Sequence, residues 1–140
     1  MIYNKDIQLL TIYIINMNIN IKTTNIELTP AISDYINKKV SSLEKFVGSV
    51  KEDAEVQAWV EVGMTTKHHE QGNIFRTEIQ IRLPHSSVRS EAEGEDLYAS
   101  IDKVRDEIQR ELKKVHGKQI TKFREGARKI KNTITGFYKK

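Results

Sequence analysis

Alternating apolar and polar positions predict four β-strands in this chain, because successive side chains of a strand point to opposite faces. The strands are expected within residues 18–28, 53–64, 74–83 and 88–94. Each strand then has one face for a core and one face for solvent. The single tryptophan, Trp59, falls on the solvent side of the second strand. It can cap the sheet, pack under another segment or stack on a nucleic-acid base, and we favour capping or packing.

Two other stretches carry apolar residues at helical spacing. In the first, Thr29 can cap the N-terminus, Pro30 suits the first helical position and Gly48 can end the helix. The second helix is expected to begin near Asp96. Its apolar stripe consists of Leu97, Ile101, Val104, Ile108, Leu112 and Val115.

The resulting order, β-α-β-β-β-α, predicts an α+β fold. In this two-layer sandwich, two helices cover one face of a mainly antiparallel four-stranded sheet. A length of 140 residues suits one such domain, which we assign to residues 17–118. Residues 1–16 form an N-terminal extension. We hypothesise that this extension reflects a mis-assigned start codon upstream of Met17, and the alternative is an additional strand from the sequence LLTIYII.

Beyond Gly117 the helical pattern weakens, and residues 119–140 are assigned to a basic tail. Ile120 and Phe123 can dock back onto the domain. The segment from Gly126 to Lys140 is expected to be mobile.

Charge is distributed unevenly along the chain. Residues 1–102 hold 10 Lys and Arg against 15 Asp and Glu, whereas residues 103–140 hold 13 against 4. The C-terminal part therefore carries a net charge of +9, which would attract a polyanion such as nucleic acid. A solvated, disordered basic tail without a specific partner is the alternative interpretation.

The sequence offers little for catalysis or metal binding. It contains no cysteine, which excludes disulfides and thiol chemistry and fits the reducing cytoplasm. His68 and His69 lie in a polar loop without obvious partners, and Ser86 and Ser87 lack a glycine elbow. We therefore expect neither an enzyme nor a metal or cofactor site. No stretch approaches the roughly 20 apolar residues of a membrane span, so no membrane partner is expected.

The second helix carries most of the candidate binding residues. Lys103, Arg110 and Lys114 are spaced by seven and four residues and therefore share one helix face, away from the apolar stripe. If the two helices pack side by side, cations of the first helix lie alongside and the set can follow a phosphate backbone. Asp106 and Glu107 weaken this reading, because they are placed for local i,i+4 pairs with Arg110 and Lys103. The candidate RNA-binding residues are Lys39, Lys45, Lys103, Arg110, Lys113, Lys114 and Lys118.

Three stretches together resemble the ribosome hibernation-promoting factor and ribosome-associated inhibitor A family over about residues 17–118. They are NIELTPAISDYINKKVSSLEKF, RTEIQIRLP and VRSEAEGEDLYASIDKVRDEIQREL. The most specific part is EGEDLYASID, and residues 29–32 with residues 43–46 form a second signature. The resemblance matches Lys39 and Lys45 to basic positions of the family's first helix, and Arg110 and Lys114 to those of its second. Glu107 and Glu111 depart from it, since many relatives carry Lys and Gln there.

The resemblance implies a fold similar to the double-stranded-RNA-binding domain. It also implies a partner, the small ribosomal subunit and its rRNA, bound in the channel for tRNA and mRNA. Such a factor inhibits translation by steric occlusion under stress or in stationary phase, without a small-molecule substrate, and is monomeric away from the ribosome. The chain resembles the short form of the family, so it is not expected to dimerise ribosomes by itself. Two alternatives are a general RNA-binding module and, less favoured, a small enzyme that uses His68 or His69.

Overall fold

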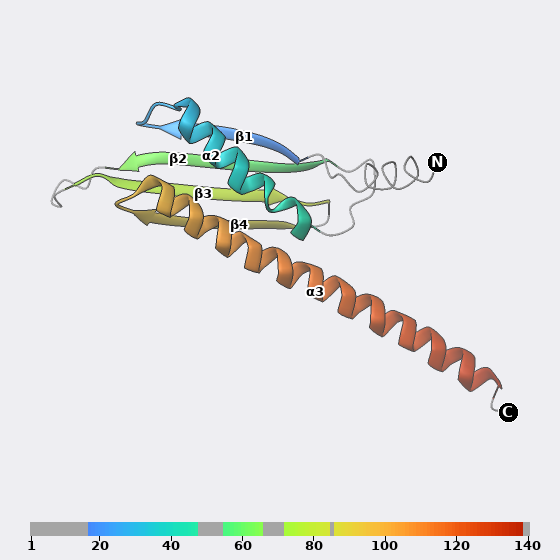
Figure 1. Ribbon diagram of the computed structural model, residues 1–140. Coiled ribbons are helices and arrows are strands. Elements are labelled where there is room, and N and C mark those ends of the chain that lie inside the picture. The colour runs from blue at the N-terminus through green and yellow to red at the C-terminus, as the bar shows by residue number, and fades with distance from the viewer. Residues whose placement is uncertain (1–16, 48–54, 66–71, 85, 139–140) are drawn as a thin grey trace, which may run out of the picture.

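The computed structural model describes residues 17–47, 55–65, 72–84 and 86–138, and within them it has two layers (Figure 1). The elements follow the order β1 (Met17–Thr24), α2 (Pro30–Ser41), the 3-10 turn η1 (Glu44–Phe46), β2 (Val56–Thr65), β3 (Ile74–Arg82), β4 (Ser87–Gly94) and α3 (Leu97–Tyr138). Both helices cover the same face of the sheet. The predicted α+β class and element order are confirmed.

The four strands lie side by side in sequence order. β1 runs parallel to β2, which is possible because the connection between them passes through α2. β2 with β3 and β3 with β4 are antiparallel. The sheet is therefore mainly antiparallel, as the sequence predicts.

The core lies between the sheet and the helices. On β2 the predicted apolar face is buried, whereas Trp59 on the other face is 47% exposed. The predicted stripe of α3 is buried from Leu97 to Leu112, and Val115 packs at its edge. A buried hydroxyl pair, Thr77 Oγ1 and Ser100 Oγ at 2.7 Å, joins β3 to α3.

The start of α2 agrees with the sequence, but its end does not. Thr29 Oγ1 accepts a hydrogen bond from the Ile32 amide at 3.2 Å, and Pro30 occupies the first turn. The helix ends at Ser41, and the chain tightens into η1 instead of continuing toward Gly48, which lies outside the described residues. This turn keeps Leu43 and Val47 in the core.

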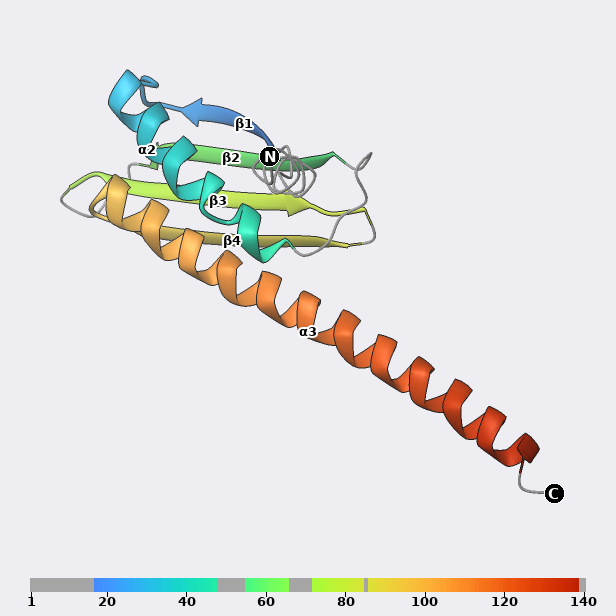
Figure 2. The same cartoon turned by 45° about the vertical axis from the view of Figure 1, so that its right-hand side comes forward.

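The largest difference from prediction is the length of α3. The sequence predicts a weakening beyond Gly117, yet the helix continues through Tyr138 and covers residues 119–138 of the predicted tail. A glycine inside a helix costs only about 1 kcal/mol relative to alanine, so Gly117 need not end it. Ile120 and Phe123 do not dock onto the domain: they are 39% and 79% exposed. Figures 1 and 2 show this part of α3 projecting beyond the sheet.

Candidate nucleic-acid interface

The outer surface of the helical layer, on the side away from the sheet, is the first part of the candidate interface. Each residue turns an α-helix by about 100°, so the residues opposite the buried stripe of α3 point outward. Lys103, Arg110, Lys113 and Lys114 are all exposed there, and Lys118 follows beyond the last residue that packs on the core. The structure thus confirms that Lys103, Arg110 and Lys114 lie opposite the apolar stripe.

The end of the first helical segment meets α3 at an aromatic ring. Lys45 Nζ lies 5.1 Å from the centre of the Phe46 ring, and Lys113 Nζ lies 5.2 Å from the same centre. An aromatic face attracts cations, so this ring can hold two ammonium groups close together despite their repulsion. The Phe46 ring therefore brings Lys45 of the first helical segment close to Lys113 of the second helix.

Further along the groove between the helices, Asp102 holds Lys39. Its carboxylate accepts a hydrogen bond from the Tyr35 hydroxyl at 2.7 Å and pairs with Lys39 Nζ at 3.2 Å. Desolvation acts to raise the pKa of Asp102, but the hydrogen bonds from Tyr35 and Lys39 outweigh it, so the pKa lies below its usual value. The same hydrogen bond to Asp102 raises the pKa of Lys39. Lys39 is therefore a cation already shared with a protein carboxylate.

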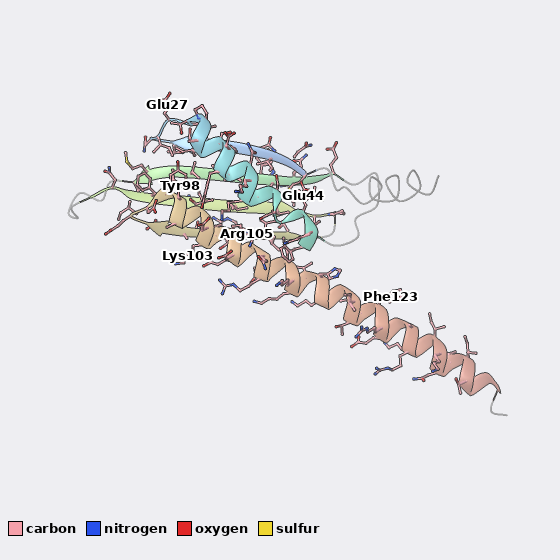
Figure 3. All side chains as sticks on the ribbon, in the orientation of Figure 1. Glu27, Glu44, Tyr98, Lys103, Arg105 and Phe123 are labelled. Atoms are coloured by element: carbon pink, nitrogen blue, oxygen red, sulfur yellow. The ribbon has the colours of Figure 1, made fainter. Side chains whose placement is uncertain are left out.

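Arg105 lies in the same groove, and the sequence reasoning missed it. Its side chain is only 17% exposed. It donates from Nε to Ser42 Oγ at 3.0 Å, donates to Gln109 and pairs with Asp106 at 3.2 Å. Figure 3 shows Arg105 on the side of α3 toward α2, with Lys103 on the other side. Its position beside the apolar stripe is the one signal in the sequence that could have indicated this contact.

The groove also forms a shallow hollow between α2 and α3. It is lined by Lys38, Lys39, Ser42, Asp102, Arg105 and Asp106. Three of these six side chains are basic and two are acidic, so the hollow is a mixed surface rather than a uniform cation site.

A second hollow lies on the opposite flank of α3, against β4. It is lined by Arg89, Ser90, Glu107, Arg110, Glu111 and Lys114. Five of the seven predicted residues therefore divide into two groups, with Lys39, Lys45 and Lys113 toward α2 and η1 and with Arg110 and Lys114 toward β4. Lys103 and Lys118 line neither hollow.

The acidic residues of α3 make different contacts from those that the spacing predicts. Neither the Asp106–Arg110 nor the Glu107–Lys103 pair occurs among the ion pairs of the described residues. Glu107 instead accepts a hydrogen bond from Ser90 on β4, and Glu111 pairs with Lys114 at 3.1 Å. Packing against β4 thus removes Glu107 from the position in which it would neutralise Lys103.

The open face of the sheet carries charge of a different kind. Arg76 and Arg89 alternate with Glu78 and Glu91 in one network, with Arg76–Glu78 at 2.8 Å, Arg89–Glu78 at 2.7 Å and Arg89–Glu91 at 3.1 Å. Arg76 also contacts Glu91. The hydrogen bond from Arg89, with that from Arg76, lowers the pKa of Glu78 despite its partial desolvation. These four residues largely neutralise one another.

Catalytic and metal-binding groups do not gather in the part of the chain that the structure describes. Within it, no three His, Cys, Asp or Glu side chains are placed to hold a metal ion. His68, His69 and His85 lie outside the described residues, and His116 is exposed on α3. Among the helices that the structure describes, none has the length and apolar content for a membrane crossing.

Comparison with known proteins identifies the family. Residues 19–120 match the family model described as Sigma 54 modulation protein / S30EA ribosomal protein, and the chain belongs to this family. A ribosome hibernation promotion factor of Bacillus subtilis is 33% identical over 109 residues, which are 78% of this chain and 53% of that protein. A ribosome hibernation promoting factor of Azotobacter vinelandii is 32% identical over 104 residues, 74% of this chain and 87% of the relative.

A solved structure supports the same assignment. The crystal structure of the Thermus thermophilus Protein Y N-terminal domain is similar with a TM-score of 0.57 and 35% identity, and the match covers 71% of this chain and 99% of that one. The resemblance inferred from the sequence is thereby confirmed. The chain spans about half the length of the curated relatives from Bacillus subtilis, Deinococcus radiodurans and Lactococcus lactis.

Proposed function

We propose that the chain is a ribosome hibernation factor. It binds the small ribosomal subunit and its rRNA in the channel for tRNA and mRNA, and it inhibits translation by filling that space under stress or in stationary phase. Two facts support the proposal: membership of a family whose relatives are named ribosome hibernation promotion factors, and a basic outer surface on the helical layer.

The contrast between the two faces of the molecule carries the assignment of the RNA-binding side. On the helical layer the exposed cations Lys103, Arg110 and Lys113 have no carboxylate of the described residues within ion-pairing distance. On the open sheet face, Arg76 and Arg89 are both held by glutamates. Lys22 on β1 and Arg82 on β3 are outside that network, but β2 separates their strands. Phosphate binding draws on neighbouring cations that are free to release counterions, so the helical layer is the face that contacts RNA.

The groove between the helices gives this face a fixed shape. Asp102 joins Lys39 and Tyr35 of α2 to α3, and Arg105 joins α3 to Ser42. A body whose helices are held in this way can block a channel without any chemical step, since occlusion requires only affinity and volume. Shape and phosphate contacts are the usual way in which structured RNA is recognised.

A general RNA-binding module is the second candidate, and one observation favours it. The cations divide into two groups on either flank of α3, with Asp106 and Glu111 among them. Such a mixed surface carries no base-reading motif and could accept many RNAs.

Co-sedimentation with ribosomes in sucrose gradients tests the proposal. The wild-type chain should migrate with small subunits, and Arg110→Glu combined with Lys114→Glu should weaken this binding by at least about tenfold. The matched control is Lys22→Glu combined with Arg82→Glu, which makes the same charge change at exposed positions of β1 and β3. Control and wild type should bind equally. Equal loss in both double variants, or equal binding to unrelated RNA of the same length, would favour the general module.

A further inference from the structure

The projecting part of α3 exposes a row of apolar side chains. In this part, residues 117–138, Ile120 is 39% exposed, Phe123 79%, Ile130 63% and Ile134 53%. Figure 3 labels Phe123 on this projection, beyond the edge of the sheet. Large apolar groups gathered in a row, on a helix segment that packs against no other described element, indicate a missing partner.

The spacing of the row specifies the type of partner. Ile120, Phe123, Ala127, Ile130 and Ile134 follow one another at intervals of three, four, three and four residues. They are the a and d positions of a heptad repeat, the pattern by which two helices pack along a seam. The neighbouring e positions hold Arg124 and Lys131, and the g positions hold Gly126 and Thr133. The apolar row occupies only the a and d positions, which is narrower than the apolar face of a helix that lies in a membrane surface. The row therefore fits a partner helix better than a membrane.

The amino-acid composition of the projection also indicates that a partner stabilises this part of the helix. It contains Gly117, Gly126 and Gly136, each of which disfavours a helix by about 1 kcal/mol relative to alanine. Most of the stability of a helix in a protein comes from packing of its apolar face rather than from the propensity of its residues. A continuous helix through Tyr138 is thus best sustained when its apolar row is covered.

We propose that a second copy of the chain covers this row, with the two projections packed antiparallel about a two-fold axis. In this register Phe123 lies against Ile134 of the second copy and Ala127 against Ile130, and the symmetry repeats both contacts. Each layer then combines a larger with a smaller side chain. The antiparallel arrangement also places the two domains at opposite ends of the paired helices, where they do not crowd each other. This proposal goes beyond the proposed function and does not depend on it, and it replaces the expectation from the family resemblance that the chain is monomeric away from the ribosome.

The charges on the seam predict an unusual dependence on salt. In an antiparallel pair the e positions of the two helices face each other, so Arg124 approaches Lys131 of the second copy. These like charges repel at low ionic strength and are screened as salt rises. Association should therefore strengthen with salt, whereas RNA binding should weaken with it. The other cations of the projection lie at b, c and f positions, away from the seam: Lys118, Lys122, Arg128 and Lys129.

Sedimentation equilibrium of the full chain at low and high salt tests the proposal. Wild type should show a reversible monomer–dimer equilibrium whose dissociation constant falls several-fold between 0.1 and 0.5 M NaCl. Arg124→Glu should lower that constant by about fivefold or more at 0.1 M salt, because the new glutamate faces Lys131 of the second copy. The matched control, Arg128→Glu, makes the same charge change at an outward position and should alter the constant by less than about twofold.

Substitutions in the apolar row test directly whether it forms the dimer interface. Phe123→Glu combined with Ile130→Glu should raise the dissociation constant by at least about tenfold, and because both side chains are exposed the domain should keep its unfolding midpoint. A chain that stays monomeric at all concentrations overturns the proposal, as does a dimer that this double variant leaves intact. Equal effects of Arg124→Glu and Arg128→Glu overturn the antiparallel seam. Flotation of a monomeric chain with anionic vesicles would assign the row to a membrane surface instead.

Discussion

The exchange of Asp102 for asparagine should have opposite effects on stability and on RNA binding. The carboxylate is the point where α2 and α3 meet, since it accepts from Tyr35 and pairs with Lys39. It also neutralises one of the cations that we assign to the RNA-binding face. Asp102→Asn keeps the shape and a hydrogen-bond acceptor for Tyr35 but removes the charge.

The magnitude follows from the exposure of the partners. The side chains of Lys39 and Asp102 are 34% and 45% exposed, so solvent screens their ion pair and it contributes less than about 1 kcal/mol. The Tyr35 hydroxyl then donates its hydrogen bond to a neutral acceptor instead of a charged one, which lowers the stability by about 0.5–1 kcal/mol. We expect the free energy of unfolding to fall by about 1 kcal/mol. If the released Lys39 gains one phosphate contact, the slope of log affinity against log salt should steepen by about 0.7–0.9.

Two assays measure these effects on the same preparations. Urea unfolding followed by circular dichroism gives the stability, and fluorescence anisotropy with small subunits between 50 and 200 mM KCl gives the affinity and its salt slope. The control is Asp106→Asn, which removes the same charge one turn away at a side chain that is 66% exposed and paired only with Arg105 among the described residues. If Asp102→Asn and Asp106→Asn show the same salt slope, Lys39 does not contact phosphate and the reasoning is refuted.

Three further predictions concern the fold. Ile108→Ala, at a fully buried position of α3, should lower the free energy of unfolding by about 2–5 kcal/mol in urea titrations, and a loss below 1 kcal/mol would contradict the core described above. Thr77→Val should cost about 1 kcal/mol, because the buried Ser100 hydroxyl loses its partner on β3 but keeps its bond to the Leu97 carbonyl; Thr77→Val combined with Ser100→Ala should recover part of the loss. The pKa values of Asp102 and Glu78 are lowered in the folded chain, so their stabilisation is present above the unfolded-state values near pH 4 and is lost as the pH falls through the lower, folded values. Unfolding measured from pH 6 to pH 2 should show this loss, and Asp102→Asn should flatten the curve; an unchanged curve would contradict the assignment.

Much of the fold follows from the sequence because burial and periodicity are local signals. Strict alternation on β2 places its valines in the core and Trp59 on the open face, as observed. The stripe from Leu97 to Leu112 likewise predicts which side of α3 is buried. Both patterns repeat with the geometry of the element, so no knowledge of distant contacts is needed.

The missed features depend on contacts between residues far apart in the chain. Arg105 reaches Ser42, and Asp102 reaches Tyr35, across 63 and 67 positions. Glu107 is drawn to Ser90 on β4 rather than to a neighbour on its own helix. The length of α3 escaped prediction because Gly117 suggests a helix end but does not impose one.

Chemical footprinting of the small-subunit rRNA shows where the chain binds. We expect the wild-type chain to protect nucleotides of the tRNA and mRNA channel. Arg110→Glu with Lys114→Glu should remove these protections, and Lys22→Glu with Arg82→Glu should leave them in place. Protections elsewhere on the subunit would contradict the proposed binding site. So would channel protections that persist in the Arg110→Glu, Lys114→Glu variant but disappear in the Lys22→Glu, Arg82→Glu variant.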